Sequence, residues 1–254
     1  MRSLIRFHLF AAVLILSWLW PVTRGLWDQL DEAVFRLLNG SLRLGEGWQF
    51  FWALANHRSV DLVSGSALGL IVICWLWGQP RDIQNKRCAA LGGLAVTLLV
   101  IPFIAHIIIK FVLNFQRHSP SLVIDGAMRL NELVPSFETK DISIYSFPGD
   151  HAFILFTAGL FFWMLGPRKI TLAAWIVAVI FMLPRLVGGA HWLTDNIIGG
   201  LAPALMVASW QLSTPLGYRL MNLCLPLVRL VIALVPKPLR IPDHSESSKA
   251  QAAG

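Results

Sequence analysis

Charged residues are scarce in this sequence. Only 14% of its 254 residues are Asp, Glu, Lys or Arg, whereas a soluble domain carries about a quarter. Hydrophobic residues make up 56% of the chain, and the mean hydropathy is +0.64. This composition excludes an ordinary soluble domain and predicts an integral membrane protein. Despite the net charge of +7, we expect no nucleic-acid partner, because the basic residues flank apolar runs and do not interleave with aromatic residues.

Cysteine is also rare. The chain has Cys74, Cys88 and Cys224, and none has a partner at the spacing of a metal-binding or redox motif. A cleavage site of small residues is missing as well, because the first apolar run ends in the bulky residues Trp18, Leu19 and Trp20. We therefore expect no cysteine-based centre, and we expect the first run to persist as an uncleaved span.

Long apolar runs, in contrast, are plentiful. A membrane-spanning helix needs about 20 mostly apolar residues. Two further segments, at 27–38 and 48–57, have helical apolar spacing with a polar face, which is typical of helices lying in the membrane interface. The sequence thus predicts an all-α polytopic membrane protein with six transmembrane helices plus interfacial amphipathic helices. The predicted spans are residues 4–22, 60–78, 88–110, 151–166, 170–186 and 195–213.

The distribution of basic residues predicts the orientation. If the N-terminus is cytoplasmic, the loops on that side collect Arg2, Arg6, Arg81, Lys86 and Arg87, while most of the fourteen acidic residues fall on the other side. We therefore expect both termini in the cytoplasm.

The domain organisation follows from the same pattern. Residues 1–213 are predicted to form one integral membrane catalytic domain. Residues 214–242 are predicted to form a kinked amphipathic helix on the cytoplasmic face rather than a seventh span, because Arg219 and Arg229 would otherwise lie in the bilayer. Residues 243–254 are polar and small, so we expect a disordered tail.

Three short motifs lie at the ends of the apolar runs. The predicted topology brings all of them to the outer membrane–water boundary, although they are spread over more than eighty residues. Charge clusters at a membrane edge are usually functional, and this one contains three cations, two histidines and a carboxylate. We interpret it as a site for moving phosphoryl groups. The motifs are Lys110-x6-Arg117, Pro148-Gly149-Asp150-His151 and Arg185-x5-His191-x3-Asp195.

The spacing in the first and third motifs suggests how their side chains cooperate. Lys110 and Arg117 are two helical turns apart, so on a helix they share a face. His191 and Asp195 are four residues apart and would face the same way. A carboxylate that accepts one ring N–H fixes the histidine tautomer and leaves the other nitrogen free to attack.

The remaining residues suit the binding and protonation of a phosphate. Together with Lys110 and Arg117, Arg185 would neutralise charge on the transferred group. The backbone N–H groups of Gly149 and Asp150 precede a predicted helix and can face an anion. His151 in the first helical turn would protonate the leaving oxygen.

These motifs resemble those of the type 2 phosphatidic acid phosphatase superfamily, which are six-span, metal-independent phosphatases and phosphotransferases. The resemblance implies that His191 becomes a phosphohistidine with Asp195 as its partner, and that His151 is the general acid. It implies phosphate binding by Lys110, Arg117 and Arg185. No metal and no cofactor are expected.

Departures from the usual family pattern point to one branch. His118 follows Arg117 where the family usually has proline, Asp150 precedes the middle histidine, and Pro184 precedes Arg185. Together with Asn56-x-Arg58-x-x-Asp61, they resemble the lipid A 1-diphosphate synthase branch. The branch implies a bacterial inner-membrane enzyme, with a periplasmic site, that moves phosphate from undecaprenyl diphosphate to the 1-phosphate of lipid A.

The sequence leaves several alternatives open. A lipid diphosphate phosphatase, chiefly acting on undecaprenyl diphosphate, would share the first half-reaction, and a non-catalytic binder of anionic membrane lipids would need only the cations. Lys140 and Arg58 are candidate accessory residues. Asp150 could orient Arg117 or Lys140, or accept a proton. The oligomeric state, and whether residues 121–147 form a lid, are not predicted.

Overall fold

The fold is helical throughout. The computed structural model describes residues 2–112, 114–136 and 138–242, so the tail predicted to be disordered lies outside the described residues. Within those ranges no β-strand forms, and the only extended pairing is an isolated bridge between His57 and Thr139 and another between Arg117 and Tyr145. The prediction of an all-α protein is confirmed.

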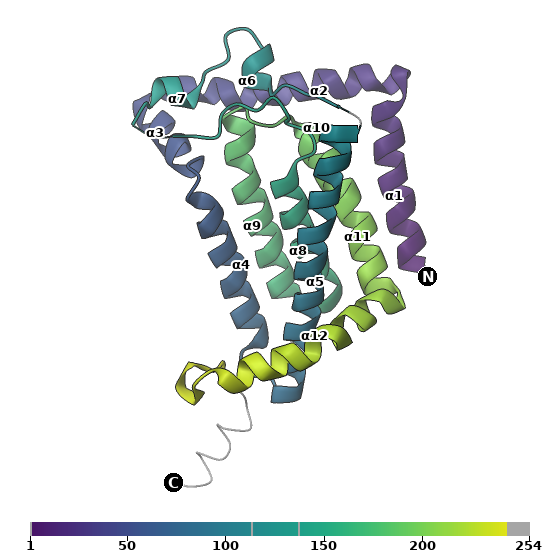
Figure 1. Ribbon diagram of the computed structural model, residues 1–254. Coiled ribbons are helices and arrows are strands. Elements are labelled where there is room, and N and C mark those ends of the chain that lie inside the picture. The colour runs from purple at the N-terminus through teal and green to yellow at the C-terminus, as the bar shows by residue number, and fades with distance from the viewer. Residues whose placement is uncertain (1, 113, 137, 243–254) are drawn as a thin grey trace.

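A bundle of roughly parallel and antiparallel helices forms the body of the molecule (Figure 1). Each predicted apolar segment corresponds to one of these helices. The last one begins with α10 (Leu193–Asn196) and the π-helical turn η3 (Ile197–Leu201) and continues into α11 (Ala202–Ser213). The other bundle helices are α1 (Arg2–Leu19), α4 (Val60–Leu76), α5 (Arg81–Ile107), α8 (Asp150–Leu165) and α9 (Arg168–Val187).

Fewer of the helices are long and apolar enough to be membrane spans than the six spans that the sequence predicts. Among the described residues, four helices are long and apolar enough to cross a membrane, at Arg2–Leu19, Arg81–Val112, Arg168–Val187 and Pro215–Leu234. Helices α4 and α8 are apolar but shorter. The count of six spans therefore stays a prediction.

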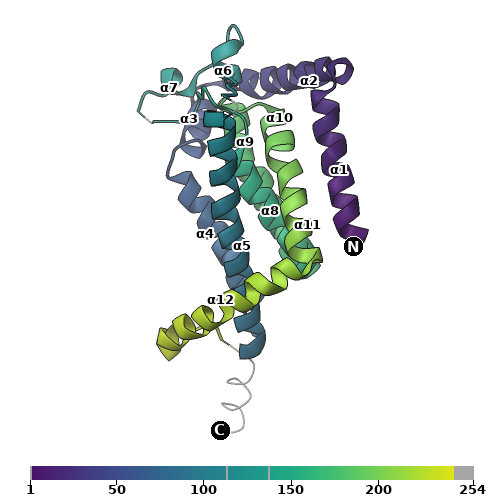
Figure 2. The same ribbon diagram turned by 45° about the vertical axis from the view of Figure 1, so that its right-hand side comes forward.

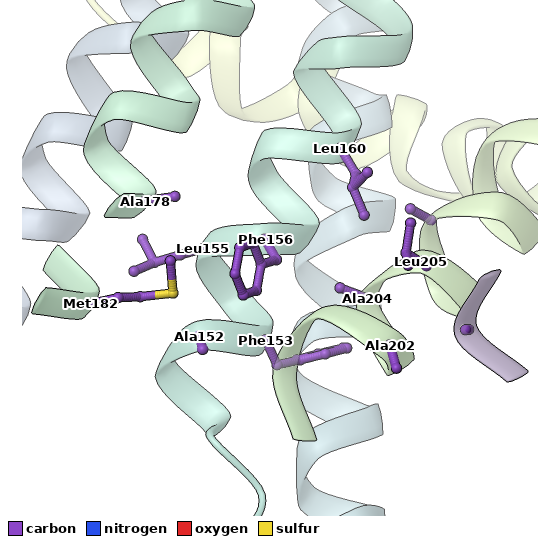
Figure 3. Packing of buried hydrophobic residues seen from close by; sticks show 12 residues of the cluster. Ala152, Phe153, Leu155, Phe156, Leu160, Ala178, Met182, Ala202, Ala204 and Leu205 are labelled. Atoms are coloured by element: carbon purple, nitrogen blue, oxygen red, sulfur yellow. The ribbon is translucent and has the colours of Figure 1, made fainter. Parts of the chain in front are cut away.

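Helix α8 lies at the centre of the bundle and is buried on nearly every side. Leu155, Phe156 and Leu160 pack among residues of α9 and α11 (Figure 3). Alanines such as Ala178 and Ala204 are fully buried there and allow the helices to approach closely. Because α8 is held rigidly, the first turn of this helix, which carries His151, has a fixed position.

The outer faces of the bundle are apolar. Leu16, Leu62, Leu99 and Val179 are each more than half exposed, although they belong to four different helices. An apolar surface of this extent is typical of helices that contact lipid.

Helix α2 (Pro21–Gly40) lies across one end of the bundle, nearly perpendicular to α1 (Figure 1). It includes the predicted amphipathic segment 27–38. The turn η1 (Ser41–Leu44) joins it to α3 (Glu46–Ala55), which corresponds to the predicted segment 48–57. One residue of the expected polar face departs from the prediction, because Asp31 is only 1% exposed.

Helix α12 (Pro215–Leu234) lies across the opposite end of the bundle (Figures 1 and 2). It crosses α5 where that helix carries Gly92 and Gly93, whose missing side chains leave room for Cys224 and Leu220. Its length and composition would suit a span, so its placement on the cytoplasmic face stays a prediction. Beyond it, the turn η4 (Lys237–Leu239) leads to Pro242, whose carbonyl accepts the Gly78 N–H at 3.1 Å.

The connection between α5 and α8 packs against α2 and α3. It begins with the π-helical turn η2 (Ile108–Val112) and contains two short helices, α6 (Pro120–Val123) and α7 (Leu130–Leu133). The Asn39 side chain of α2 accepts from the Met128 N–H and donates to the Met128 carbonyl, both at 2.8 Å. The segment is thus tied down by side-chain hydrogen bonds.

Candidate active site

A cavity of about 1040 Å³ opens at the end of the bundle that is covered by α2. It unites residues that are far apart in the sequence and includes most of the predicted site. The apolar part of its wall comes from α1, α4, α5, α8, η3 and α11 and from the segment 142–148. The charged and imidazole side chains that line it are Asp61, Lys110, Lys140, Asp150, His151, Arg185 and His191.

His191 is held in one tautomer. Its Nδ1 lies 2.7 Å from the carbonyl oxygen of Ser146, and because a carbonyl can only accept, Nδ1 must donate. The other ring nitrogen, Nε2, then keeps its lone pair. A histidine that lines the cavity with a free nitrogen can attack an electrophile.

Asp195 is a more distant partner than the sequence suggests. Its Oδ2 lies 3.6 Å from His191 Nδ1 and accepts the Trp192 N–H at 2.8 Å. The expectation that both residues share a helical face is wrong, because His191 lies in the loop before α10 and only Asp195 belongs to the helix. The turn at Gly189, with φ of +77°, creates this loop.

His151 is placed as predicted, in the first turn of α8 and on the cavity wall. The Asp150 side chain accepts the backbone N–H of His151 at 2.7 Å, a contact between neighbours within the first turn of α8. Asp150 also lines the cavity, yet among the described contacts it pairs with neither Arg117 nor Lys140.

Gly149 has a packing role that the sequence did not reveal. Its N–H donates to the carbonyl of Asp195 at 3.0 Å, so this group is not available to an anion. A Cβ at this position would lie 2.7 Å from the same oxygen. Gly149 therefore allows α8 to approach α10, and this close contact brings His151 towards the third motif.

Lys110 and Arg117 do not share a helical face. Lys110 belongs to the π-helical turn η2, which ends at Val112, and Arg117 follows in an extended segment bridged to Tyr145. Lys110 lines the cavity, with its ammonium 5.1 Å from the centroid of the Tyr145 ring. The helical interpretation fails because the helix ends between the two residues.

Arg117 lies beside the cavity and is paired with carboxylates. It donates to Asp31 at 2.7 Å and to Asp195 at 2.5 Å, and its side chain is 12% exposed. Within the described part of the chain, it is not among the residues that line the cavity. The geometry gives this guanidinium two acidic partners before any phosphate is present.

Arg185 reaches the cavity from the end of α9. Its side chain is 7% exposed and donates to the Asn56 carbonyl at 2.9 Å and to Asp61 at 2.7 Å. Asp61 also pairs with Lys140 at 2.7 Å. One carboxylate thus holds two cations at the cavity wall, where they can bind the oxygens of a phosphate.

The two accessory candidates separate in the structure. Lys140 lines the cavity, whereas Arg58 lies on the surface with its side chain 67% exposed and pairs with Glu138 at 2.8 Å. Arg58 is not among the described residues of the cavity wall.

The roles of Asp31 and Ser146 are not predictable from the sequence. Asp31 belongs to the polar face of the predicted amphipathic segment 27–38, and Ser146 contributes a backbone carbonyl, which no side-chain pattern reveals. Asp61 was visible only as part of Asn56-x-Arg58-x-x-Asp61. In the sequence, a buried acidic residue on an amphipathic helix cannot be told from an exposed one until its basic partner is known.

The assembled groups suit phosphoryl transfer. A nucleophilic nitrogen, a second histidine and three cations surround one space, which is what a transferred phosphoryl group requires. No cluster of three or more metal-ligating side chains occurs among the described residues. Metal independence stays a prediction, which activity in excess chelator would test.

Comparison with known proteins places the chain in a family. The sequence model of the PAP2 superfamily matches residues 90–216. "Lipid A 1-diphosphate synthase" of Escherichia coli (strain K12) is 31% identical over 220 residues, which cover 87% of this chain and 91% of that protein. "Putative undecaprenyl-diphosphatase YbjG" of the same organism is 26% identical over 185 residues, or 73% of this chain and 83% of that protein. No solved structure matches the chain.

The matched region contains the three motifs and the cavity residues from Lys110 to His191. The family assignment and the site therefore rest on the same part of the molecule. The chain belongs to the PAP2 superfamily, and it is an enzyme that transfers or hydrolyses phosphoryl groups.

Proposed function

We propose that this enzyme moves a phosphoryl group from undecaprenyl diphosphate to the 1-phosphate of lipid A, through a phosphohistidine at His191. The observation that carries the proposal is the cavity in which His191 and His151 meet Lys110, Lys140 and Arg185. The relative named lipid A 1-diphosphate synthase supports the choice of acceptor.

The shape of the cavity suits a lipid diphosphate. Leu68 of α4, Phe103 of α5 and Ile154 of α8 line it together with the charged groups. A polyprenyl chain can pack along such apolar residues while its diphosphate contacts the cations. Arg185 and the lysines would neutralise the charge on the transferred group.

The first step forms the phosphoenzyme. His191 Nε2 attacks the terminal phosphorus, and the bond from phosphorus to the bridging oxygen breaks. His151 donates a proton to that oxygen, and the lipid monophosphate departs. The hydrogen bond from Nδ1 to the Ser146 carbonyl stabilises the imidazolium that forms.

The second step releases the group. An oxygen of the acceptor phosphate attacks the phosphorus, the bond to Nε2 breaks, and His191 returns to its neutral form. A proton from solvent restores His151. If water is the acceptor instead, His151 takes the proton of that water, as microscopic reversibility requires.

The deciding experiment uses purified protein and undecaprenyl diphosphate with a labelled terminal phosphate, with and without lipid A. Label on lipid A is the expected result. Free phosphate in both reactions, with unlabelled lipid A, would contradict transfer and favour hydrolysis. Hydrolysis is the second candidate, because the other relative is named as an undecaprenyl-diphosphatase.

We also propose a membrane arrangement. Six spans would cross a bacterial inner membrane, with the cavity facing the periplasm and α12 on the cytoplasmic face. Support comes from the opposite placement of α2 and α12 and from the start of α1 away from the cavity (Figures 1 and 2). After Cys74, Cys88 and Cys224 are replaced by serine, single cysteines are introduced at Glu32 and at Arg219. An impermeant thiol reagent should label only the former in intact cells with a permeable outer membrane.

The two accessory candidates provide a test of the phosphate-binding cations. We expect Lys140→Gln to raise KM for the lipid diphosphate by about tenfold, because a charged hydrogen bond contributes about 1.5–3 kcal/mol. Arg58→Gln is the matched control and should change KM less than twofold, since its side chain lies on the surface. Equal effects of the two substitutions on KM would remove Lys140 from the site.

A further inference from the structure

We infer that Asp31 is a positioning residue, through which the transverse helix α2 holds the loop of His191 in place. The inference deepens the proposed function, since it rests on His191 as the reacting group. The guanidinium of Arg117 carries the connection from Asp31 to that loop.

Both carboxylate oxygens of Asp31 accept hydrogen bonds, from Thr194 within the third motif and from Arg117. Its side chain is 1% exposed. Its Oδ1 accepts the Thr194 N–H at 2.8 Å, and its Oδ2 accepts the Thr194 hydroxyl at 2.5 Å and Arg117 at 2.7 Å. Burial raises the pKa of the Asp31 carboxyl, while the bonds from Thr194 and the charge of Arg117 oppose that shift. A buried acid so completely bonded fixes the position of its partners.

Arg117 links this carboxylate to Asp195. One terminal nitrogen contacts Asp31, and the other contacts Asp195 and the Thr194 hydroxyl, the latter at 2.8 Å. The guanidinium also lies 5.4 Å from the centroid of the Trp192 ring and 5.7 Å from that of Trp18. Three of its five N–H donors are thus directed at protein partners, and its faces lie near two indole rings.

The network ends at the nucleophile. Asp195 accepts the Trp192 N–H and lies 3.6 Å from His191 Nδ1, and Trp192 directly follows His191 in the chain. Two buried carboxylates share one guanidinium, so the cluster carries a net negative charge when both are ionised. Such a charge favours the imidazolium that forms when His191 attacks.

The Arg117 backbone contributes separately. Its carbonyl accepts the N–H and the hydroxyl of Ser146 at 2.8 and 2.9 Å, and the Ser146 carbonyl in turn orients His191. A substitution of the Arg117 side chain leaves these backbone bonds available. Such a variant therefore tests the guanidinium alone.

The experiment measures consumption of labelled undecaprenyl diphosphate by the full-length protein. Asp31→Asn should lower kcat by about 10- to 100-fold and leave KM within about twofold, because the cluster lies outside the cavity wall. The matched control is Asp28→Asn on the same helix, where Asp28 is 53% exposed and pairs with Arg24. That control should retain the kcat of the wild type.

A second readout separates positioning from phosphate binding. Asp31→Asn should lower kcat, as Arg117→Gln does, yet leave the inhibition constant for inorganic phosphate unchanged. The double variant should be no slower than Arg117→Gln alone, since both residues act through one network. If Asp31→Asn does not fold, Arg117→Lys, which keeps the charge but loses the two-pronged contact, should show the same loss in kcat.

Two results would overturn the inference. One is a wild-type kcat in Asp31→Asn, and the other is a phosphate inhibition constant that rises in Asp31→Asn by the factor through which kcat falls. The proposed function can fail without this inference failing. The proposed function is tested by which molecule receives the label, whereas the inference is tested by the relative rates at which the variants consume the donor, whichever acceptor is used.

Discussion

Replacing His191 with alanine is expected to abolish turnover, with a loss of at least about 10⁴-fold in kcat. The physical reason is that Nε2 is the nitrogen left free by the bond from Nδ1 to the Ser146 carbonyl, and alanine offers no nucleophile. The measurement is release or transfer of label from undecaprenyl diphosphate, combined with detection of acid-labile, base-stable phosphate on the protein.

The matched control is His118→Ala. This histidine is exposed, lies next to Arg117 and is not among the described residues that line the cavity. It should retain both activity and the phosphoenzyme. Wild-type turnover by His191→Ala, or a phosphoenzyme that persists in it, would refute the assignment of the nucleophile.

Replacing His151 with glutamine is expected to separate transfer from hydrolysis. A general acid or base contributes about 10²–10⁴-fold, and glutamine can donate a hydrogen bond but cannot exchange the proton. Attack by water needs a base. Attack by a phosphate does not, because its second pKa is about 6 and its oxygens are already ionised at neutral pH.

Hydrolysis of the phosphoenzyme should therefore fall by about 10²–10⁴-fold in His151→Gln, whereas transfer to the 1-phosphate of lipid A should fall much less. The first step is common to transfer and hydrolysis, so any loss there lowers both products alike and does not change their ratio. The measurement is the ratio of labelled lipid A to free phosphate, with His118→Gln as the control. An unchanged ratio would show that His151 serves binding and does not move a proton.

The helices were largely predictable because their signals are local. Each bundle helix coincides with an apolar run, and α2 coincides with an amphipathic one, since hydrophobic periodicity depends only on neighbouring residues. The prediction fails between Lys110 and Arg117. There the chain leaves helical geometry at Val112, and seven-residue spacing no longer places side chains on one face.

The sequence predicts most of the residues that line the cavity, but it predicts less well which groups their side chains contact. His151, His191, Lys110 and Arg185 line the cavity as their position at the membrane edge suggested. Spacing predicts the carboxylate of Asp195 beside His191, and it lies 3.6 Å from Nδ1, but folding brings the Ser146 carbonyl closer, at 2.7 Å. Backbone groups have no sequence signature of their own.

The sequence by itself determined the family, the helical class and the level at which the reactive side chains lie, because each of these follows from motifs and apolar runs along the chain. Only the tertiary structure decided which charges meet. The transverse helix α2 carries Asp31 to Arg117, and α4 carries Asp61 to Arg185, across more than eighty residues of sequence. Such pairings depend on how helices pack, and no local pattern contains that information.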